Sequence, residues 1–421
     1  MAFCDNASAR TEHEGERTGA ESDDEEEKVA AFLKRCDLDP VALDRIHEFA
    51  RSRTGCEVER APVQGYCSYT LVIRGGRRWR DSGVEVGGLA AATEGIYDGN
   101  GDGEGTWGGR LVQFRPGRHG IDVDLCREAR DVLGGGVVPH VEALGVVKGL
   151  ERRGGGVGGE MEGFVVERVD GLSLTEFRRR ELAGRRARGE VVSGLAKLFA
   201  ASWGGRREVG GGDGRGRVGS SLRWRLGLMA DELPREFGDV ARGVMRAMDD
   251  IEGLPWVITH GDLVADNIMV ESEGDGAGRL VGLIDWAEAE WLPFGVGLYG
   301  LEEVLGQDVG ADDTDKTRFE YYPDAMELRA MFWVEVAKVV DDEDAIRTAK
   351  MAQVLGVLLW RGIAFDDGAL SRVVNEEDWW DVQRLRTWLF DERGLGFTSE
   401  RPAWWERTWR KLQGWVGWCL R

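Results

Sequence analysis

The spacing of apolar residues changes along the chain. Helical spacing over residues 29–36 and 40–52, with Ala42, Ile46 and Phe49 on one face, predicts that the ordered part begins with helix. Runs rich in β-branched and aromatic residues then predict short strands, and a helical pattern separates the second from the third: the strands cover 67–74, 111–115, 141–147 and 164–169, and the helix 122–133. We therefore expect a small sheet with one inserted helix.

Beyond Gly171 helical patterns dominate the sequence. They cover residues 174–199, 224–248, 326–340, 345–363 and 379–390. Only one compact β region is expected among them, a hairpin that pairs residues 267–270 with 280–284. The predicted fold class is therefore α+β, with a small β-rich N-terminal lobe and a larger helical C-terminal lobe.

The expected organisation has three parts. Residues 1–30 are rich in acidic side chains and predict a disordered, solvated tail. Residues 31–168 would form the N-terminal lobe and 169–421 the helical lobe. Its last segment, 402–421, is tryptophan-rich and has one apolar helical stripe, which either covers the helical lobe or lies at a membrane interface.

The charge of the chain and the spacing of its cysteines indicate which ligands and which cellular location to expect. The chain has 76 Asp plus Glu against 55 Lys plus Arg, a net charge of −21, which argues against a nucleic-acid partner and suits cationic or neutral small molecules. The six cysteines lie far apart without CxxC spacing, so we expect reduced thiols and a cytoplasmic protein. No signal peptide or transmembrane segment is predicted, because charges interrupt every apolar run.

The most informative segment is residues 257–270, VITHGDLVADNIMV. It places His260, Asp262 and Asn267 on one tight loop between apolar runs, and Asp285 follows the second strand of the hairpin. Two carboxylates and an amide close together supply the oxygen ligands of a Mg²⁺ site beside a proton acceptor. The alternative for Asp262 and Asn267 is a self-hydrogen-bonded turn, and His260 either braces the loop or takes part in proton transfer.

This pattern, H-G-D-x-x-x-x-N followed by I-D-W, resembles the aminoglycoside phosphotransferase and choline kinase families, which have a protein-kinase-like fold. The run over 283–302 is similar to a branch common in fungi, and the resemblance covers about residues 60–305. It implies that Asp262 is the base that accepts the substrate hydroxyl proton. Asn267 and Asp285 would hold Mg²⁺ against the phosphates of ATP or GTP.

The resemblance also assigns nucleotide-contacting positions in the N-terminal lobe. Arg115 stands where the family normally has a lysine, and Glu128 matches the acid that pairs with this cation, unless it is an ordinary exposed helix charge. Gly65 and Ser68 lie in the segment that resembles the turn over the phosphates, for which a simple hairpin turn is the alternative.

Three further segments qualify this interpretation. The backbone from Glu167 to Val169 matches the adenine-contacting hinge. A formal GxGxxG at 154–159 is rejected as a dinucleotide site because a strand pattern follows it. After Asp285 the chain reads WLPFGVGLYG, without the acidic residue that many relatives carry there, and Glu288 and Glu290 face a cationic substrate, cap a helix or lie in solvent.

The sequence thus predicts a cytoplasmic, magnesium-dependent kinase that moves the γ-phosphate of ATP or GTP to a hydroxyl of a small molecule. The alternative is a nucleotide-binding pseudokinase or scaffold, which the arginine at position 115 favours.

Overall fold

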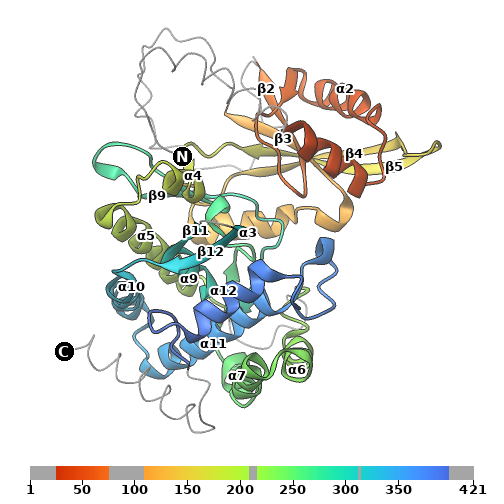
Figure 1. The fold of residues 1–421 in the computed structure, drawn as a ribbon. Coiled ribbons are helices and arrows are strands. Elements are labelled where there is room, and N and C mark those ends of the chain that lie inside the picture. The colour runs from red at the N-terminus through yellow and green to blue at the C-terminus, as the bar shows by residue number, and fades with distance from the viewer. Residues whose placement is uncertain (1–24, 75–108, 208–215, 312–313, 398–421) are drawn as a thin grey trace. The chain divides into compact units, whose positions relative to one another are not determined.

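The computed structural model describes residues 25–74, 109–207, 216–311 and 314–397 (Figure 1). They form two compact units. The first contains the described residues up to Gly120 together with Val141–Arg168, and the second contains Ile121–His140 and the described residues from Val169 onward. This division differs from the predicted lobes in residues 121–140, which pack within the second unit because their helix contacts a helix of that unit.

The first unit is built on an antiparallel sheet with strand order β1-β2-β3-β5-β4. Its strands are β1 (Glu57–Arg60), β2 (Tyr69–Arg74), β3 (Arg110–Arg115), β4 (Val141–Glu151) and β5 (Val157–Glu167). The glycine cluster that gave the formal GxGxxG forms the β4–β5 turn, where Gly154, Gly155 and Gly156 have φ of 84°, 97° and 99°. The rejection of a dinucleotide site at this position is therefore confirmed, since no helix follows the cluster.

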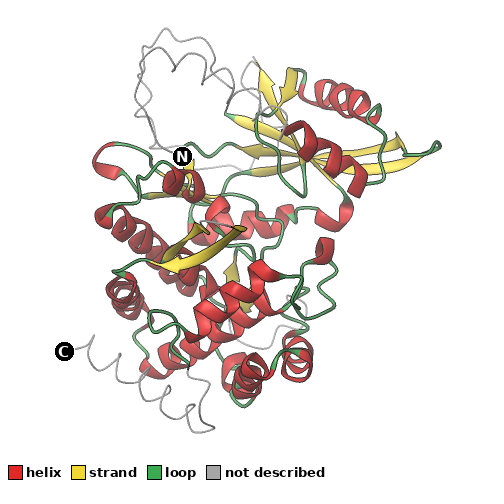
Figure 2. Ribbon diagram, in the orientation of Figure 1, coloured by secondary structure: helices red, strands yellow, loops and turns green. Residues whose placement is uncertain are grey.

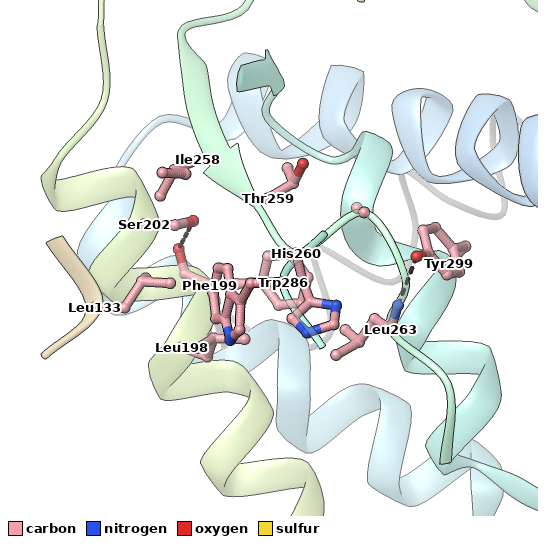
Figure 3. A pocket seen from close by; sticks show the side chains of 12 residues that line it. Leu133, Leu198, Phe199, Ser202, Ile258, Thr259, His260, Leu263, Trp286 and Tyr299 are labelled. Carbon is pink, nitrogen blue, oxygen red and sulfur yellow. Dashed lines mark hydrogen bonds between the residues drawn. The ribbon is translucent and has the colours of Figure 1, made fainter. Parts of the chain in front are cut away.

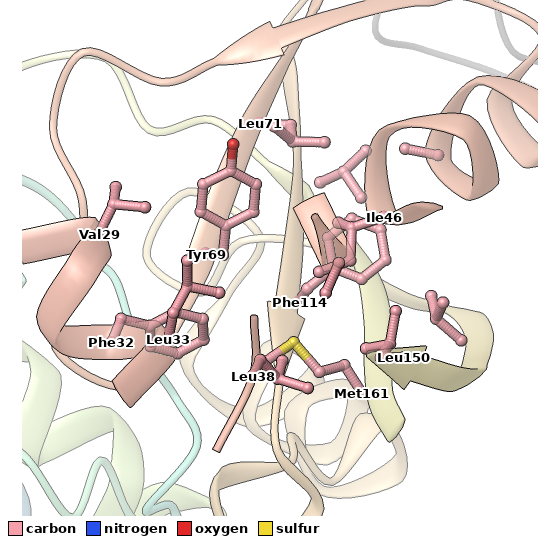
Figure 4. Close-up of a cluster of buried hydrophobic side chains, with 14 of the residues drawn as sticks. Val29, Phe32, Leu33, Leu38, Ile46, Tyr69, Leu71, Phe114, Leu150 and Met161 are labelled. Atoms are coloured by element: carbon pink, nitrogen blue, oxygen red, sulfur yellow. The ribbon is translucent and has the colours of Figure 1, made fainter. Parts of the chain in front are cut away.

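Helices cover this sheet with apolar faces. Helix α2 (Ala42–Thr54) packs against β1 and β4 and buries Ala42, Ile46 and Ala50, as its spacing predicts. Figure 4 shows the core that results, in which side chains of the helices meet those of the strands. The short helix η1 (Gly117–His119) follows β3.

Part of the segment predicted to be a disordered acidic tail is helical. Residues 25–35 are helical, and Val29, Phe32 and Leu33 from this helix belong to the core of the first unit. The expectation of disorder over 1–30 is therefore wrong for residues 25–30, because three apolar side chains at helical spacing have a core to enter. Residues 1–24 lie outside the described residues, as does the tryptophan-rich segment over 402–421.

The second unit is mainly helical (Figure 2). Its helices are α3 (Val123–Leu133), α4 (Leu174–Arg179), α5 (Arg185–Gly204), α6 (Leu222–Glu232), α7 (Arg235–Met245), α8 (Met248–Glu252), α9 (Tyr299–Val304), α10 (Ala325–Val340), α11 (Glu343–Gly362) and α12 (Trp379–Phe390), with the short turns η3 (Ala265–Asn267), η4 (Gly274–Gly276), η5 (Val296–Leu298) and η6 (Asp366–Gly368). The helix predicted over 224–248 is three helices. Pro234 separates α6 from α7, because proline has no N–H to donate within a helix. Among the described residues, no helix has both the length and the apolar content needed to cross a membrane.

Among the described residues of the second unit, strands form three separate groups, whereas the sequence predicted one β region. The predicted hairpin is present as β8 (Ile268–Val270) and β9 (Leu280–Leu283), to which β6 (Leu172–Ser173) adds a third strand. A pair formed by β7 (Trp256–Thr259) and β10 (Glu290–Pro293) and a hairpin of β11 (Gly306–Ala311) and β12 (Thr314–Tyr321) were not predicted. These strands have no alternating pattern of apolar and polar residues that would have predicted them. Strands β7 and β10 are buried on both faces, and β11 contains glycines and polar residues.

Candidate catalytic site

The loop over residues 260–267 connects β7 to β8, and the segment over 284–289 connects β9 to β10. Both strand pairs are antiparallel, with Thr259 opposite Glu290 and Ile268 opposite Leu283. The two connections therefore leave the same ends of these strands and lie against each other. This topology brings the two halves of the H-G-D…I-D-W pattern together.

Asp262 and Asn267 are joined by their side chains. The amide nitrogen Nδ2 of Asn267 donates to Oδ2 and to the backbone oxygen of Asp262, each at 2.9 Å. Asn267 is buried, and its backbone N–H donates to Val264 O. The five-residue spacing thus closes the loop into one turn, with the Asp262 carboxylate oriented by the amide.

Backbone hydrogen bonding brings Asp285 to the same place. The N–H of Ile284 donates to Asn267 O at 3.0 Å, so Asp285 follows directly after a residue paired with Asn267. Asp285 has φ of 63°, a left-handed conformation that is uncommon for residues other than glycine but tolerated by aspartate. Asp285 also contributes to the electrostatic environment of His260 and Asp262.

His260 braces these two connections. Its Nδ1 accepts the backbone N–H of Asp262 at 3.2 Å, and its Nε2 donates to Ile284 O at 2.8 Å. Burial lowers the pKa of His260 to about 4, so the ring is neutral, and Trp286 packs edge-on against it at 4.7 Å between ring centroids. Because both ring nitrogens are used by backbone groups, the geometry gives His260 a positioning role and leaves no nitrogen for proton transfer.

The electrostatic environment of Asp262 disfavours its charged form. Burial, and next the neighbouring charge of Asp285, raise the pKa of Asp262 to about 7, while the hydrogen bond from Asn267 opposes this shift. A carboxyl group whose pKa lies near neutrality is suited to accept a proton at physiological pH. Glu288 also raises this pKa, whereas the guanidinium of Arg361 lowers it.

The donor set fits a Mg²⁺ ion that is shared with phosphates. Since Asn267 uses its amide nitrogen on Asp262, its amide oxygen is the atom it can offer to a cation, and Asp285 adds a carboxylate. Within the described ranges, no group of three or more His, Cys, Asp or Glu side chains forms a self-sufficient metal site. Two oxygen ligands are enough for Mg²⁺, which in nucleotide sites takes its other ligands from phosphate and water.

The predicted phosphate turn lies between β1 and β2 in the first unit. Gln64 closes this turn: its side chain donates to Ala61 O and Thr70 O and accepts the N–H of Thr70, each at 2.9 Å. Ser68 is buried, with its hydroxyl 3.4 Å from that of Thr70, and Gly65 lies against Ser68. Sequence reasoning missed Gln64, whose signal was only a polar residue before the glycine.

Arg115 ends β3 and is buried, with weak hydrogen bonds to His119 O and Gln113 Oε1 at 3.3–3.4 Å. The acid predicted to pair with it, Glu128, lies on α3 in the second unit. Glu128 forms a salt bridge with Arg207 at 3.1 Å and accepts the indole N–H of Trp291 at 3.0 Å. These contacts attach α3 to the β7–β10 pair.

The hinge predicted over Glu167 to Val169 coincides with a passage between units. Glu167 is the last residue of β5 and Val169 belongs to the second unit, where its side chain lies against Gly282 of β9.

Two residues near the site make contacts that the sequence did not predict. Glu290 is buried in β10 and accepts the N–H groups of Val218 and Gly219 at 3.1 and 2.9 Å, so it anchors the turn before α6 rather than facing a substrate. Tyr299 accepts the N–H of Leu263 with its hydroxyl (Figure 3). The only sequence signal for Tyr299 was its place in the run that lacks the expected acid.

A small cavity lies behind His260 and Leu263, lined mainly by apolar side chains of α5, β7 and Trp286 (Figure 3). Its volume of about 20 Å³ has room for one water molecule and excludes a substrate.

Comparison with known proteins agrees with the resemblance. Residues 124–301 match the model of the phosphotransferase enzyme family. This segment contains α3, the loop with Asp262 and Asn267, and Asp285. With the division into a β-rich and a helical unit, the match confirms the family resemblance and the kinase-like fold class.

Several solved structures are similar at low identity. A GDP complex of aminoglycoside 2'-phosphotransferase-IIIa is 11% identical, with a TM-score of 0.44, covering 89% of this chain and 98% of that chain. A thermostable mutant of aminoglycoside phosphotransferase APH(4)-Ia with ADP and hygromycin B is 13% identical, with a TM-score of 0.42 and coverage of 81% and 98%. No curated protein is similar enough to this chain to count as a match.

Proposed function

We propose, from the match to the phosphotransferase enzyme family, that this protein is a magnesium-dependent kinase that moves the γ-phosphate of ATP or GTP to a hydroxyl of a small molecule. The observation that carries the proposal is the hydrogen-bonded turn of Asp262 and Asn267, with Asp285 attached to it through the bond from Ile284 to Asn267.

Asp262 is the proton acceptor in this reaction. The substrate hydroxyl oxygen forms a bond to the γ-phosphorus, the bond from that phosphorus to the β–γ bridging oxygen breaks, and the hydroxyl proton passes to the Asp262 carboxylate. The amide of Asn267 and the N–H accepted by His260 hold this carboxylate in one orientation. Orientation matters most here, because phosphoryl transfer needs in-line positioning more than covalent help from the protein.

Asn267 and Asp285 would hold Mg²⁺ through their side-chain oxygens. The ion would neutralise charge on the phosphates. Support for this assignment comes from the oxygen character of the donor set and from the use of the Asn267 amide nitrogen by Asp262.

The substrate is a hydroxyl-bearing small molecule, and a cationic one suits the charge of the protein. The net charge is −21, and the exposed Glu288 lies beside the loop, where it contributes to the field on Asp262.

Nucleotide binding and transfer separate this proposal from a pseudokinase. We expect Mg²⁺ with ATP or GTP to raise the melting temperature, and the wild type to transfer γ-phosphate to at least one member of a panel of amino sugars, amino alcohols and sugars. Asp262→Asn should bind nucleotide normally and lose at least about 10²-fold in turnover, the usual contribution of a general base. Nucleotide binding with equal inactivity of both proteins would support the pseudokinase instead.

The metal assignment is tested at Asp285. Asp285→Asn should weaken the Mg²⁺-dependent part of the thermal shift, because one negative oxygen ligand becomes neutral. Asp266→Asn is the matched control, since Asp266 lies on the same loop and is exposed. Equal Mg²⁺ dependence in the two variants would remove Asp285 from the metal site.

A further inference from the structure

We propose that Tyr299 is a positioning residue that holds the catalytic loop through a neutral hydrogen bond, in the region where an acidic residue was expected from the resemblance. The inference rests on the proposed function, which makes residues 260–267 a catalytic loop. It concerns Tyr299 of α9 and the aromatic ring of Trp360 that fixes it.

The contact is made next to the base itself. Leu263 follows Asp262 in the chain, and its backbone N–H donates to the Tyr299 hydroxyl at 2.8 Å (Figure 3). Leu263 is 2% exposed, so water does not replace this acceptor. Since a buried N–H without an acceptor is strongly disfavoured, the hydroxyl fixes the peptide unit between residues 262 and 263.

The tyrosine ring is held in turn by α11. Its ring and that of Trp360 are stacked with centroids 4.7 Å apart and an interplanar angle of 11°. Gly300 lets Leu263 approach, since a Cβ there would lie 2.2 Å from Leu263 Cδ2. The glycine-rich run that replaced the expected acid thus places a rigid aromatic acceptor beneath the loop.

The Tyr299 hydroxyl that accepts the Leu263 N–H is uncharged, unlike a carboxylate. Burial, and next the negative charge of Asp262, raise the pKa of Tyr299 well above its usual value, so the hydroxyl stays uncharged. The Leu263 N–H is therefore accepted by a neutral hydroxyl rather than by a charged group.

Tyr299→Phe tests the role of the hydroxyl while keeping the ring and its stack. The matched control is Tyr322→Phe, which also removes a hydroxyl from a buried tyrosine of the second unit, where it donates to Gln307 at 3.2 Å. Hydrogen–deuterium exchange should become faster in the peptide covering 260–267 in Tyr299→Phe and stay unchanged there in the control. In transfer assays kcat should fall about tenfold or more with KM for nucleotide nearly unchanged, because misplacement of a catalytic group acts on turnover.

Trp360→Leu provides a second, independent readout. If Trp360 acts by fixing Tyr299, its effect on loop exchange should largely disappear in the Tyr299→Phe background, so that the double variant resembles the single Tyr299→Phe variant.

These experiments distinguish a failure of the proposed Tyr299 role from a failure of the proposed kinase function. Unchanged exchange over 260–267 in Tyr299→Phe overturns the brace, and faster exchange with unchanged kcat overturns its positioning role. If the wild type transfers no phosphate, the proposed function fails, whereas the exchange comparison still decides whether Tyr299 orders the loop.

Discussion

Positive φ angles mark both connections of the candidate site at the scale of single residues. Gly261 has φ of 77° and Asp285 has φ of 63°. Glycine adopts this conformation without strain, and its missing side chain lets Glu288 O approach where a Cβ would lie 1.8 Å from that oxygen. The glycine of the His-Gly-Asp motif is therefore needed for contact between the two connections.

Gly261→Ala should separate the loop over 260–267 from the segment over 284–289. We expect a lower melting temperature and loss of transfer activity, because both backbone strain and a clash with Glu288 O oppose the native loop. Gly274→Ala is the control: it has φ of 70° but nothing within 4 Å of its added Cβ, so it measures the strain alone, about 1–2 kcal/mol. Equal destabilisation of the two variants would contradict the clash.

His260 predicts a pH dependence of stability. Its pKa is about 4 in the folded protein, whereas the ordinary pKa of a histidine is 6.5, so the unfolded chain binds more protons between these two pH values. Stability from the neutral imidazole is complete above pH 6.5 and is lost as pH falls towards 4, by on the order of 3 kcal/mol.

Urea unfolding of wild type and His260→Gln between pH 4 and 7 measures this effect. The difference in unfolding free energy between the two proteins should shrink as pH falls, because glutamine does not titrate. A constant difference across this range would show that the histidine is not buried in its neutral form.

At the scale of elements, β10 presents a buried acid to the turn before α6. Burial raises the pKa of Glu290 to about 7, although the N–H groups of Gly219 and Val218 oppose this shift. Ionisation of Glu290 is therefore unfavourable in the folded state, and its contribution to stability falls as pH rises from about 4.5 to 7.

Glu290→Gln should accordingly be more destabilising at pH 5 than at pH 8. Up to about 3 kcal/mol of the difference from wild type should disappear over this range, because only the wild type must ionise a buried group. Unfolding free energies at the two pH values measure it, and a difference that grows with pH would contradict the burial argument.

At the scale of the whole molecule, one fully buried carboxylate connects several elements of the second unit. Glu302 of α9 accepts hydrogen bonds from Arg329 of α10 at 2.7 Å, Gln353 of α11 at 2.8 Å and Tyr321 of β12 at 2.5 Å. Burial raises the pKa of Glu302, and Arg329 is the largest opposing influence. Loss of the arginine would leave a buried charge without its counter-ion.

Arg329→Met should therefore destabilise the protein by about 3–5 kcal/mol. The same substitution at the exposed Arg279–Glu271 pair, Arg279→Met, should change stability by less than about 1 kcal/mol. Thermal and denaturant unfolding of both variants tests the contrast, and similar effects would show that the Glu302 cluster does not connect these elements energetically.

The spacing of apolar residues predicted the helices and strands that have one buried face and one exposed face. Helices α3, α10 and α12 lie within a few residues of their predicted bounds, because one-sided burial leaves a repeating pattern. The bounds of α11 and of the β8–β9 hairpin are also close to the prediction, although residues 349–358 of α11 are all buried. The β7–β10 pair has no such pattern, since all eight of its residues are buried. The position of α3 in the second unit was also beyond prediction, because packing partners distant in sequence decide it.

The sequence by itself determined which chemical groups the candidate site holds: a carboxylate, an amide and a second carboxylate, with a spacing that only a few turns can accommodate. Tertiary structure decided what supports them, namely the two backbone bonds of His260, the Ile284–Asn267 bond and the Tyr299 hydroxyl beneath Leu263. The physical reason is the difference between contacts that are local in the sequence and contacts between distant segments. Local spacing specifies which groups one loop presents, whereas the acceptor for a buried N–H comes from whichever distant element packs against it.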